Sequence, residues 1–341
     1  MTAAPIAILS TGLVTSVGLT AAATCAAIRA GVTNPTETHF IDSTGAWMMA
    51  HQVPLEQGHR GLKRLAKMAA LALEECLAEI PRADWVHLPV ILCVAEEDRP
   101  GRAAGLDSQL LPQIERELGT RFSEKSLIVP HGRVSVGAAL VQARKLIETN
   151  AAPYVVIAAT DSLLSWPTLD AYDRARRLLT AENSDGFMPG EGAGAVLVGP
   201  ATNHTQLQCT GLGFAVESAH IDSEQPLRGD GLAQAFKLAL GEAGYEMHQL
   251  DFRIADLSGE QYYFKEAALA VARVMRELKH GFDIWHPAEC IGETGAVAGA
   301  ATIAVAEAAC RKKYARGRNM LLHAAGDSGR RVAAVLQYQV P

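Results

Sequence analysis

The sequence predicts an α/β protein built from two similar halves. Apolar strands and amphipathic helices alternate along the whole chain, which is the pattern of an α/β fold. Two short segments also repeat: Ala-Ala-Thr-Asp-Ser at 158–162 and Ala-Ala-Gly-Asp-Ser at 324–328. Each ends an apolar strand that follows a Gly-Ala-Ala helix start, so the shared order indicates an internal duplication.

The first half alternates strands and helices up to a glycine-rich segment. The helix expected from Gly61 to Ile80 shows the pattern most clearly, because its apolar residues recur at helical spacing and Pro81 follows its end. Residues 31–58 show no clear periodicity. The other elements expected here are strands at 5–14, 87–95 and 154–159 and helices at 20–30, 106–118 and 137–148.

The second half follows the same alternation. Gly244 is well placed to end a helix that begins at Leu232, and Ser258 with Gln261 suggests a capping box for the next helix. The other expected elements are strands at 207–214, 252–256 and 320–325 and helices at 260–278 and 299–313.

The segment Asp185–Val198 contains three alternate glycines followed by an uninterrupted apolar run. Glycines at 190, 192 and 194 allow close backbone approach, and the apolar run is typical of a strand covered on both faces. A phosphate-binding loop is the alternative, but such loops connect a strand to a helix, whereas these glycines precede a strand. We therefore expect a structural turn and strand.

Composition excludes several classes of function. The chain has 341 residues, is 49% hydrophobic and 20% charged, and carries a net charge of −6 with no long basic run. We therefore expect no nucleic-acid partner and no membrane segment. The six cysteines are scattered without metal-like spacing, which predicts reduced, buried thiols in a cytoplasmic protein with no metal site and no cofactor.

Four segments spread over nearly the whole chain carry recognisable patterns: Thr11–Gly18, Asp185–Val198, Leu238–Tyr245 with the strand to Asp256, and Gly292–Ala300. In this order they resemble segments of β-ketoacyl synthases (3-oxoacyl-ACP synthases), the condensing enzymes of the thiolase superfamily. The resemblance implies a thiolase-like duplicated αβαβα five-layer fold with the site between its halves, and usually a dimer. We place the halves at 1–200 and 201–341 in one compact unit. The chain is shorter than typical members, mainly before residue 180.

The resemblance also locates the family's reactive groups, and this chain has replaced them. The acylated cysteine lies three residues before the glycine that opens its helix, here Gly137, and Val134 stands at that position. An isopropyl group cannot form a thioester. The two histidines that stabilise charge during decarboxylation correspond to Asp256, after Ala255, and to Glu293.

Two further positions differ from the family pattern. The supporting lysine is replaced by Ala288, and the phenylalanine that gates the pocket in a Gly-Phe-Gly-Gly turn is replaced by Asp327. A pocket holding Asp256, Glu293 and Asp327 would repel a malonyl carboxylate. We expect Arg133 and Arg330, which are near this site in the sequence, to pair with these acids and fill the cavity.

Two alternative nucleophiles remain open in the sequence. Ser135 adjoins the lost cysteine and has His131 four residues upstream, and Cys290 with His286 precedes Glu293. We favour an ordinary buried thiol for Cys290. Tyr262 and its aromatic neighbours are expected to pack within their helix.

Loss of every reactive group predicts a catalytically degenerate protein that acts by binding. We expect an accessory or adaptor role, as a homodimer or as a heterodimer with a ketosynthase-like or other protein, such as one of a biosynthetic or secretion cluster. An acyl carrier protein is a further possible partner. The alternatives are an active acyltransferase that uses rearranged residues, and a small-molecule binder in the former acyl pocket.

Overall fold

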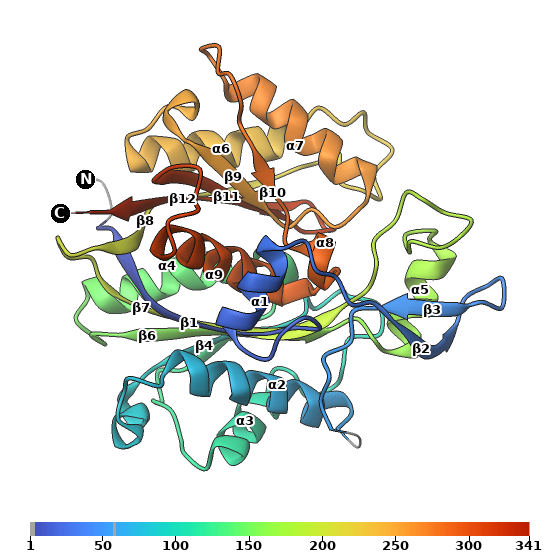
Figure 1. The fold of residues 1–341 in the computed structure, drawn as a ribbon, viewed down its shortest axis with the longest axis horizontal. Coiled ribbons are helices and arrows are strands. Elements are labelled where there is room, and N and C mark those ends of the chain that lie inside the picture. The colour runs from blue at the N-terminus through green and yellow to red at the C-terminus, as the bar shows by residue number, and fades with distance from the viewer. Residues whose placement is uncertain (1–3, 57–58, 341) are drawn as a thin grey trace.

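The computed structural model describes residues 4–56 and 59–340, which fold into five layers (Figure 1). Helices α6 (Asp230–Ala243) and α7 (Gln261–Val274) cover one outer face, and α2 (Gly61–Cys76) and α3 (Leu110–Leu118) cover the other. Helices α4 (Ser135–Glu148) and α9 (Ala298–Arg311) lie in the middle, between two layers of strands. This is the predicted αβαβα arrangement.

Within the described residues, ten strands form one sheet in the order β10-β9-β11-β12-β8-β1-β7-β6-β4-β5. The first half contributes β1 (Ile6–Val14), β4 (Val90–Cys93), β5 (Leu127–Val129), β6 (Val155–Ser162) and β7 (Glu191–Pro200). The second half contributes β8 (Gln206–Val216), β9 (Phe252–Ala255), β10 (Ile284–Trp285), β11 (Asn319–Ala325) and β12 (Arg330–Gln339). The order 5-4-6-7-1 mirrors 10-9-11-12-8, as a duplication predicts. Antiparallel pairing of β1 with β8 joins the two sets.

The two middle helices approach each other and the sheet closely. A Cβ on Gly299 would lie 2.7 Å from Cβ of Val136, and one on Gly137 would lie 2.4 Å from Cγ2 of Val332. Each helix follows a 3₁₀ turn, Gly132–Val134 before α4 and Gly295–Val297 before α9. The two Gly-Ala-Ala helix starts are therefore packing requirements of the fold.

The glycine-rich segment enters β7, which is buried along almost its whole length. A Cβ on Gly190 would lie 2.6 Å from the carbonyl oxygen of Ile291, and one on Gly192 would lie 2.7 Å from that of Val14. Neighbouring backbone thus occupies the space that side chains would need, which confirms the structural interpretation of Asp185–Val198.

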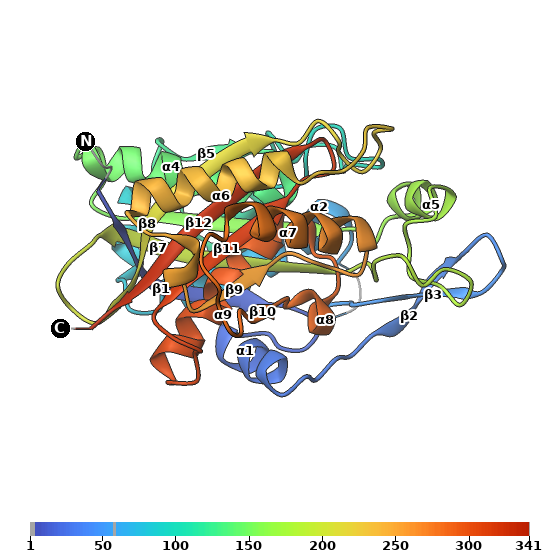
Figure 2. The same cartoon turned by 90° about the horizontal axis from the view of Figure 1, so that it is seen from above.

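Several short elements lie outside the sequence prediction. Strands β2 (Thr36–Ile41) and β3 (Trp47–Ala50) form a hairpin that projects from the body, close to α5 (Trp166–Arg174) (Figure 2). The other short elements are η1 (Arg82–His87), η3 (Met247–Gln249) and α8 (Ala288–Ile291). Helix α1 (Ala21–Arg29), in contrast, agrees with the helix expected at 20–30. The region 31–58 gave no periodic signal because only part of one face of this hairpin is buried.

Candidate functional site

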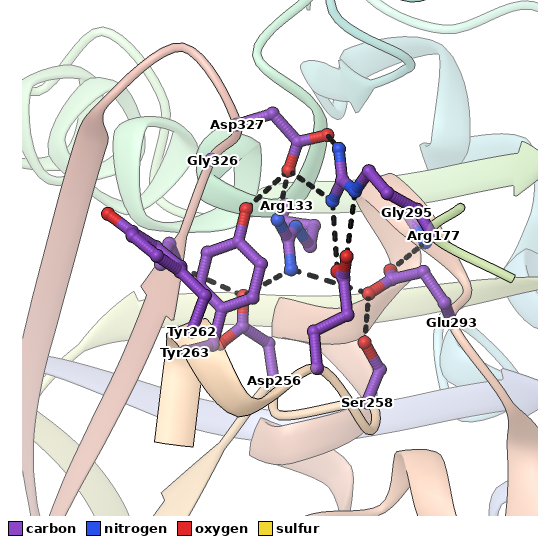
Figure 3. A network of polar contacts seen from close by, with 12 residues as sticks. Arg133, Arg177, Asp256, Ser258, Tyr262, Tyr263, Glu293, Gly295, Gly326 and Asp327 are labelled. Carbon is purple, nitrogen blue, oxygen red and sulfur yellow. Dashed lines mark hydrogen bonds and ion pairs between the residues drawn. The ribbon is translucent and has the colours of Figure 1, made fainter. Parts of the chain in front are cut away.

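A cluster of buried charged side chains occupies the space between the N-terminal ends of the middle helices (Figure 3). Arg133 lies in the 3₁₀ turn before α4 and is 8% exposed. Its guanidinium contacts Asp327, lies 3.4 Å from Oε2 of Glu293 and 3.9 Å from Oδ2 of Asp256, and stacks over Tyr263. A single arginine thus reaches all three acids that the sequence placed at this site.

Asp327 lies in the turn between β11 and β12 and accepts hydrogen bonds from three elements. Arg133 donates from the turn before α4, Arg177 donates to Oδ2 over 2.7 Å, and the hydroxyl of Tyr263 donates to Oδ1 over 2.5 Å. Burial alone would raise the pKa of Asp327, but Arg133 and Arg177 hold it well below its usual range. The carboxylate is therefore charged and firmly held.

Arg177 links Asp327 to a second buried acid. It lies just after α5 and pairs with Glu260 through two bonds, from Nε over 2.7 Å and from Nη2 over 2.9 Å. Such two-point pairing fixes the guanidinium plane as well as its position. The network therefore ties α5 and α7 to the β11–β12 turn.

Asp256 and Glu293, at the two expected histidine positions, are both buried and share the charge of Arg133. Oε2 of Glu293 accepts from the hydroxyl of Ser258 over 2.9 Å, and its Oε1 accepts from the amide of Gly295 over 2.8 Å. Burial raises the pKa of Glu293 to about 7, against the attraction of Arg133. Burial raises the pKa of Asp256 as well. The two acids thus hold a proton more readily than in water.

Val134, at the expected nucleophile position, packs into a small apolar cluster with Ala324 and Val332. Its neighbour Ser135 is fully buried. The Ser135 hydroxyl donates to the carbonyl of Val129 over 3.1 Å and accepts from the amide of His131. Ser135 therefore ties the start of α4 to β5 and lies outside the charged cluster.

A related arrangement occurs at the repeated position in the first half. Asp161 accepts from Nη1 of Arg99 over 2.8 Å and from the amide of Ala296, in the turn before α9, over 2.9 Å. Arg99 also pairs with Glu96. In each half, the aspartate that follows the Ala-Ala repeat thus contacts the 3₁₀ turn of the other half, and Asp161 and Asp327 are structural equivalents.

Little free volume remains inside the site. The cavity bounded by Arg133, Arg177, Glu293 and Asp327 has a volume of about 10 Å³. A second cavity of about 10 Å³ lies behind Asp256 and Glu293. Volumes of this size hold about one water molecule. The paired side chains therefore fill the space between the helix ends.

Three sequence expectations are corrected by these contacts. Arg330 lies 2.6 Å from Nδ1 of His131 and forms no ion pair with the cluster acids among the described residues, because it points outward at the start of β12. The Ser258 hydroxyl bonds Glu293, so it does not cap α7, whose N-cap is Glu260. Tyr263 packs on its helix as expected but also donates to Asp327.

Cys290 is an ordinary buried thiol, as expected. It is 5% exposed in α8, and burial raises its pKa. The ring of His286 lies 3.1 Å from the exposed Glu289. All six cysteines are buried and free. Their raised pKa values, such as about 12 for Cys25 and Cys76, disfavour thiolate chemistry.

Sequence reasoning missed four members of the network: Arg177, Ser258 as a donor, Glu260 and the hydroxyl of Tyr263. Ser258 was interpreted as part of a capping box, the other three lie in no motif, and Arg177 contacts residues 83 and 150 positions away. The sequence did contain one signal for a missed arginine. Asp327 stands at the repeat position of Asp161, so each of the two aspartates needs an arginine as its partner.

Among the described residues, no group of three or more potential ligands is arranged to bind a metal ion. The described helices include none that is long and apolar enough to span a membrane.

The chain resembles known proteins in its fold and not in its sequence. No protein-family model and no curated protein matches the sequence. Solved structures do match over 98% of the chain. One is a ketosynthase in complex with its chain length factor from Xenorhabdus doucetiae, with a TM-score of 0.81, 13% identity and 98% of that chain covered.

The chain has the ketosynthase fold. The ishigamide ketosynthase/chain length factor gives a TM-score of 0.75 at 17% identity with 99% of that chain covered. An oxazolomycin ketosynthase domain from Streptomyces albus JA3453 gives 0.79 at 14% identity with 76% of that chain covered. These structures confirm the thiolase-like fold that the sequence predicts.

Proposed function

We propose that this chain is a ketosynthase-like protein that performs no condensation and acts as the protein partner of a ketosynthase-like enzyme. The main observation is that Arg133 pairs with Asp256 and Glu293 at the two expected histidine positions. Arg133 and Arg177 also both pair with Asp327, so these side chains occupy the site. This proposal rests on the replaced residues together with their buried pairing.

The chemistry of the cluster supports this proposal. A condensing site needs a nucleophile, room for an acyl chain, and groups that stabilise a developing negative charge. Val134 offers no nucleophile, the cavity admits about one water, and the buried acids Asp256 and Glu293 stand where the family's charge-stabilising histidines are expected. A third cavity, bordered by Arg133 and Asp256 and lined by apolar side chains of α4 and α9, has a volume of about 30 Å³, far below the roughly 300–1,000 Å³ of small-molecule sites, which argues against a ligand in the former acyl pocket.

Two observations support the proposed partner role: the complexes among the similar structures, and a sheet-edge strand in this chain. One similar structure is a ketosynthase bound to its chain length factor, and another is a ketosynthase with an acyl-carrier protein. Within the described residues, β5 forms one edge of the sheet and pairs with β4 alone, while β10 forms the other edge. The β5 residues Leu127 and Ile128 are half-buried, so an apolar edge is available for a partner's strand.

The first experiment tests condensation directly. Purified protein is incubated with acyl and malonyl thioesters, with and without acyl carrier protein, and followed by intact-protein mass and CO₂ release. We expect neither a covalent adduct nor CO₂. An adduct lost in Ser135→Ala or in Cys290→Ser would instead establish the alternative, an acyltransferase with a rearranged nucleophile. An active ketosynthase run in parallel verifies the assay.

The second experiment tests the partner. The tagged chain is purified from its native cell, and co-purifying proteins are identified by mass spectrometry. A stoichiometric protein with the ketosynthase fold is expected. Leu127→Asp should reduce its recovery at least tenfold, whereas Leu278→Asp, at a residue 87% exposed and outside the sheet edge, should not. A chain that purifies alone, or recovery unaffected by Leu127→Asp, contradicts the proposal.

A further inference from the structure

A second cavity, much larger than the charged site, opens on the first half. Its volume is about 800 Å³, within the roughly 300–1,000 Å³ range of small-molecule sites. Its walls are strand β2, residues 52–56 and 59–60 before α2, the start of α2, the loop 95–106 and the start of α5. Its floor includes Asp161 and Ser162 at the end of β6 and Ala95 just after β4. Strands β4 and β6 are parallel, and the carboxyl ends of parallel strands are a common place for ligands.

The acids on the floor of this cleft are already neutralised. Glu191 accepts from Nε of Arg64 over 2.9 Å, from the amide of Val53 over 3.0 Å and from the hydroxyl of Ser162 over 3.0 Å. Asp161 is paired with Arg99. Neither carboxylate is therefore free to bind a cation, and a metal or amine ligand has no charged acceptor on the floor.

Hydrogen-bond donors at the cleft remain unused. Arg60 is exposed, and no ion pair or side-chain hydrogen bond involves it within residues 4–56 and 59–340. Arg64 uses Nε and Nη2, which leaves its Nη1 without a partner in the same part of the chain. His39 and His59 lie on the same walls. Glu56 also lines the cleft and adds one negative charge to it. Arg102 forms an ion pair with Asp107.

We propose that this cleft binds a small organic anion whose carboxylate or phosphate is held by the guanidinium of Arg60, with Nη1 of Arg64 as a further donor. Arginine presents a planar pair of donors that suits either group. Phe40, Leu106 and Leu164 also line the cleft and provide apolar walls for the body of the ligand. This site is separate from the proposed partner role and does not require it.

The test uses probes that share one shape and differ in charge. Benzoate, phenyl phosphate and neutral benzamide are titrated into the full chain by calorimetry. One or both anions should bind at least tenfold more tightly than benzamide, and the preferred anion identifies the head group. Arg60→Ala should weaken that anion about tenfold, while Arg60→Lys should restore part of the affinity. Arg121→Ala, at an exposed arginine outside the cleft, should leave binding unchanged.

Three results would overturn the proposal. They are equal binding of benzamide and the anions, no binding of any probe, or wild-type affinity in Arg60→Ala. Arg60 is exposed, so its variants are expected to fold, and an unchanged unfolding midpoint verifies this for each variant.

Discussion

Among the described residues, Asp327 alone pairs with both Arg133 and Arg177, so it holds the charged cluster together. We predict that Asp327→Asn lowers the free energy of unfolding by about 2–3 kcal/mol, since it weakens hydrogen bonds to two charged guanidinium groups that keep Glu293 and Glu260 as partners. Urea unfolding followed by circular dichroism measures the change. Asp107→Asn is the matched control, because Asp107 pairs with Arg102 at an exposed position and should cost about 1 kcal/mol or less. Equal losses in the two variants would contradict the assigned role.

Glu293 makes stability depend on pH near neutrality. Its pKa is raised from an ordinary value of 4.5 to about 7 in the folded chain, so folding takes up a proton between these values. Its favourable contribution is therefore fully present below pH 4.5 and lost as pH rises through 7. We predict that the wild type loses about 2–3 kcal/mol relative to Glu293→Gln between pH 5 and pH 8.

Unfolding curves for both proteins at each pH test this dependence. Glu293→Gln keeps the size of the side chain and removes its titration, so the remaining pH dependence of the variant reports all other groups. A difference between the two proteins that stays constant from pH 5 to pH 8 would show that Glu293 keeps one protonation state.

The sequence located the cluster acids but not their complete pairing. Asp256, Glu293 and Asp327 were found because each stands at a defined position in a motif. Arg133 was expected to pair with these acids because it lies near the site in the sequence. Arg177 was missed because its partners are distant in the sequence, and the direction of a side chain after α5 has no local signal. Arg330 was wrongly expected to pair with the acids, because the direction of its side chain likewise has no local signal.

At the scale of elements, the paired 3₁₀ turns before α4 and α9 require glycine. Gly295 has φ of +56°, and a Cβ there would lie 2.1 Å from Oδ2 of Asp161. We predict that Gly295→Ala costs at least ~2 kcal/mol, since it adds backbone strain and displaces the pair of Asp161 with Arg99. Gly241→Ala is the control. Gly241 lies in α6 with open space around it, so alanine should stabilise by roughly 0.5–1 kcal/mol. Thermal unfolding measures the stability of both variants. If Gly295→Ala stabilised the chain as Gly241→Ala does, the predicted strain at residue 295 would be contradicted.

Long periodic elements were predictable, and short ones were not. The amphipathic pattern of α2 and the apolar runs of β4 and β6 were clear because each buries a whole face or both faces. Strands β2 and β10 expose much of their length, so their sequences carry no alternation. The capping box at Ser258 failed because the buried carboxylate of Glu293 attracts that hydroxyl more strongly than a helix amide does.

At the scale of the whole molecule, the two halves share one core. The largest apolar cluster contains residues of both, such as Leu140 of α4 and Ile303 of α9, and the ten-stranded sheet continues through β1 and β8. Arg133 adds buried pairs that cross between the halves. Neither half can close its inner face alone, because the missing half supplies the opposing helix.

We therefore predict that the chain unfolds in one cooperative transition. Trp85 reports the first half and Trp285 the second, and both are packed against aromatic rings. Each of two variants keeps one of these tryptophans and has the other three replaced by phenylalanine. Both variants are unfolded in urea, and the transition is followed by fluorescence. For each variant, the fluorescence midpoint and slope should match those from circular dichroism. A fluorescence transition in the Trp285 protein that precedes its circular dichroism transition would show that the second half unfolds independently.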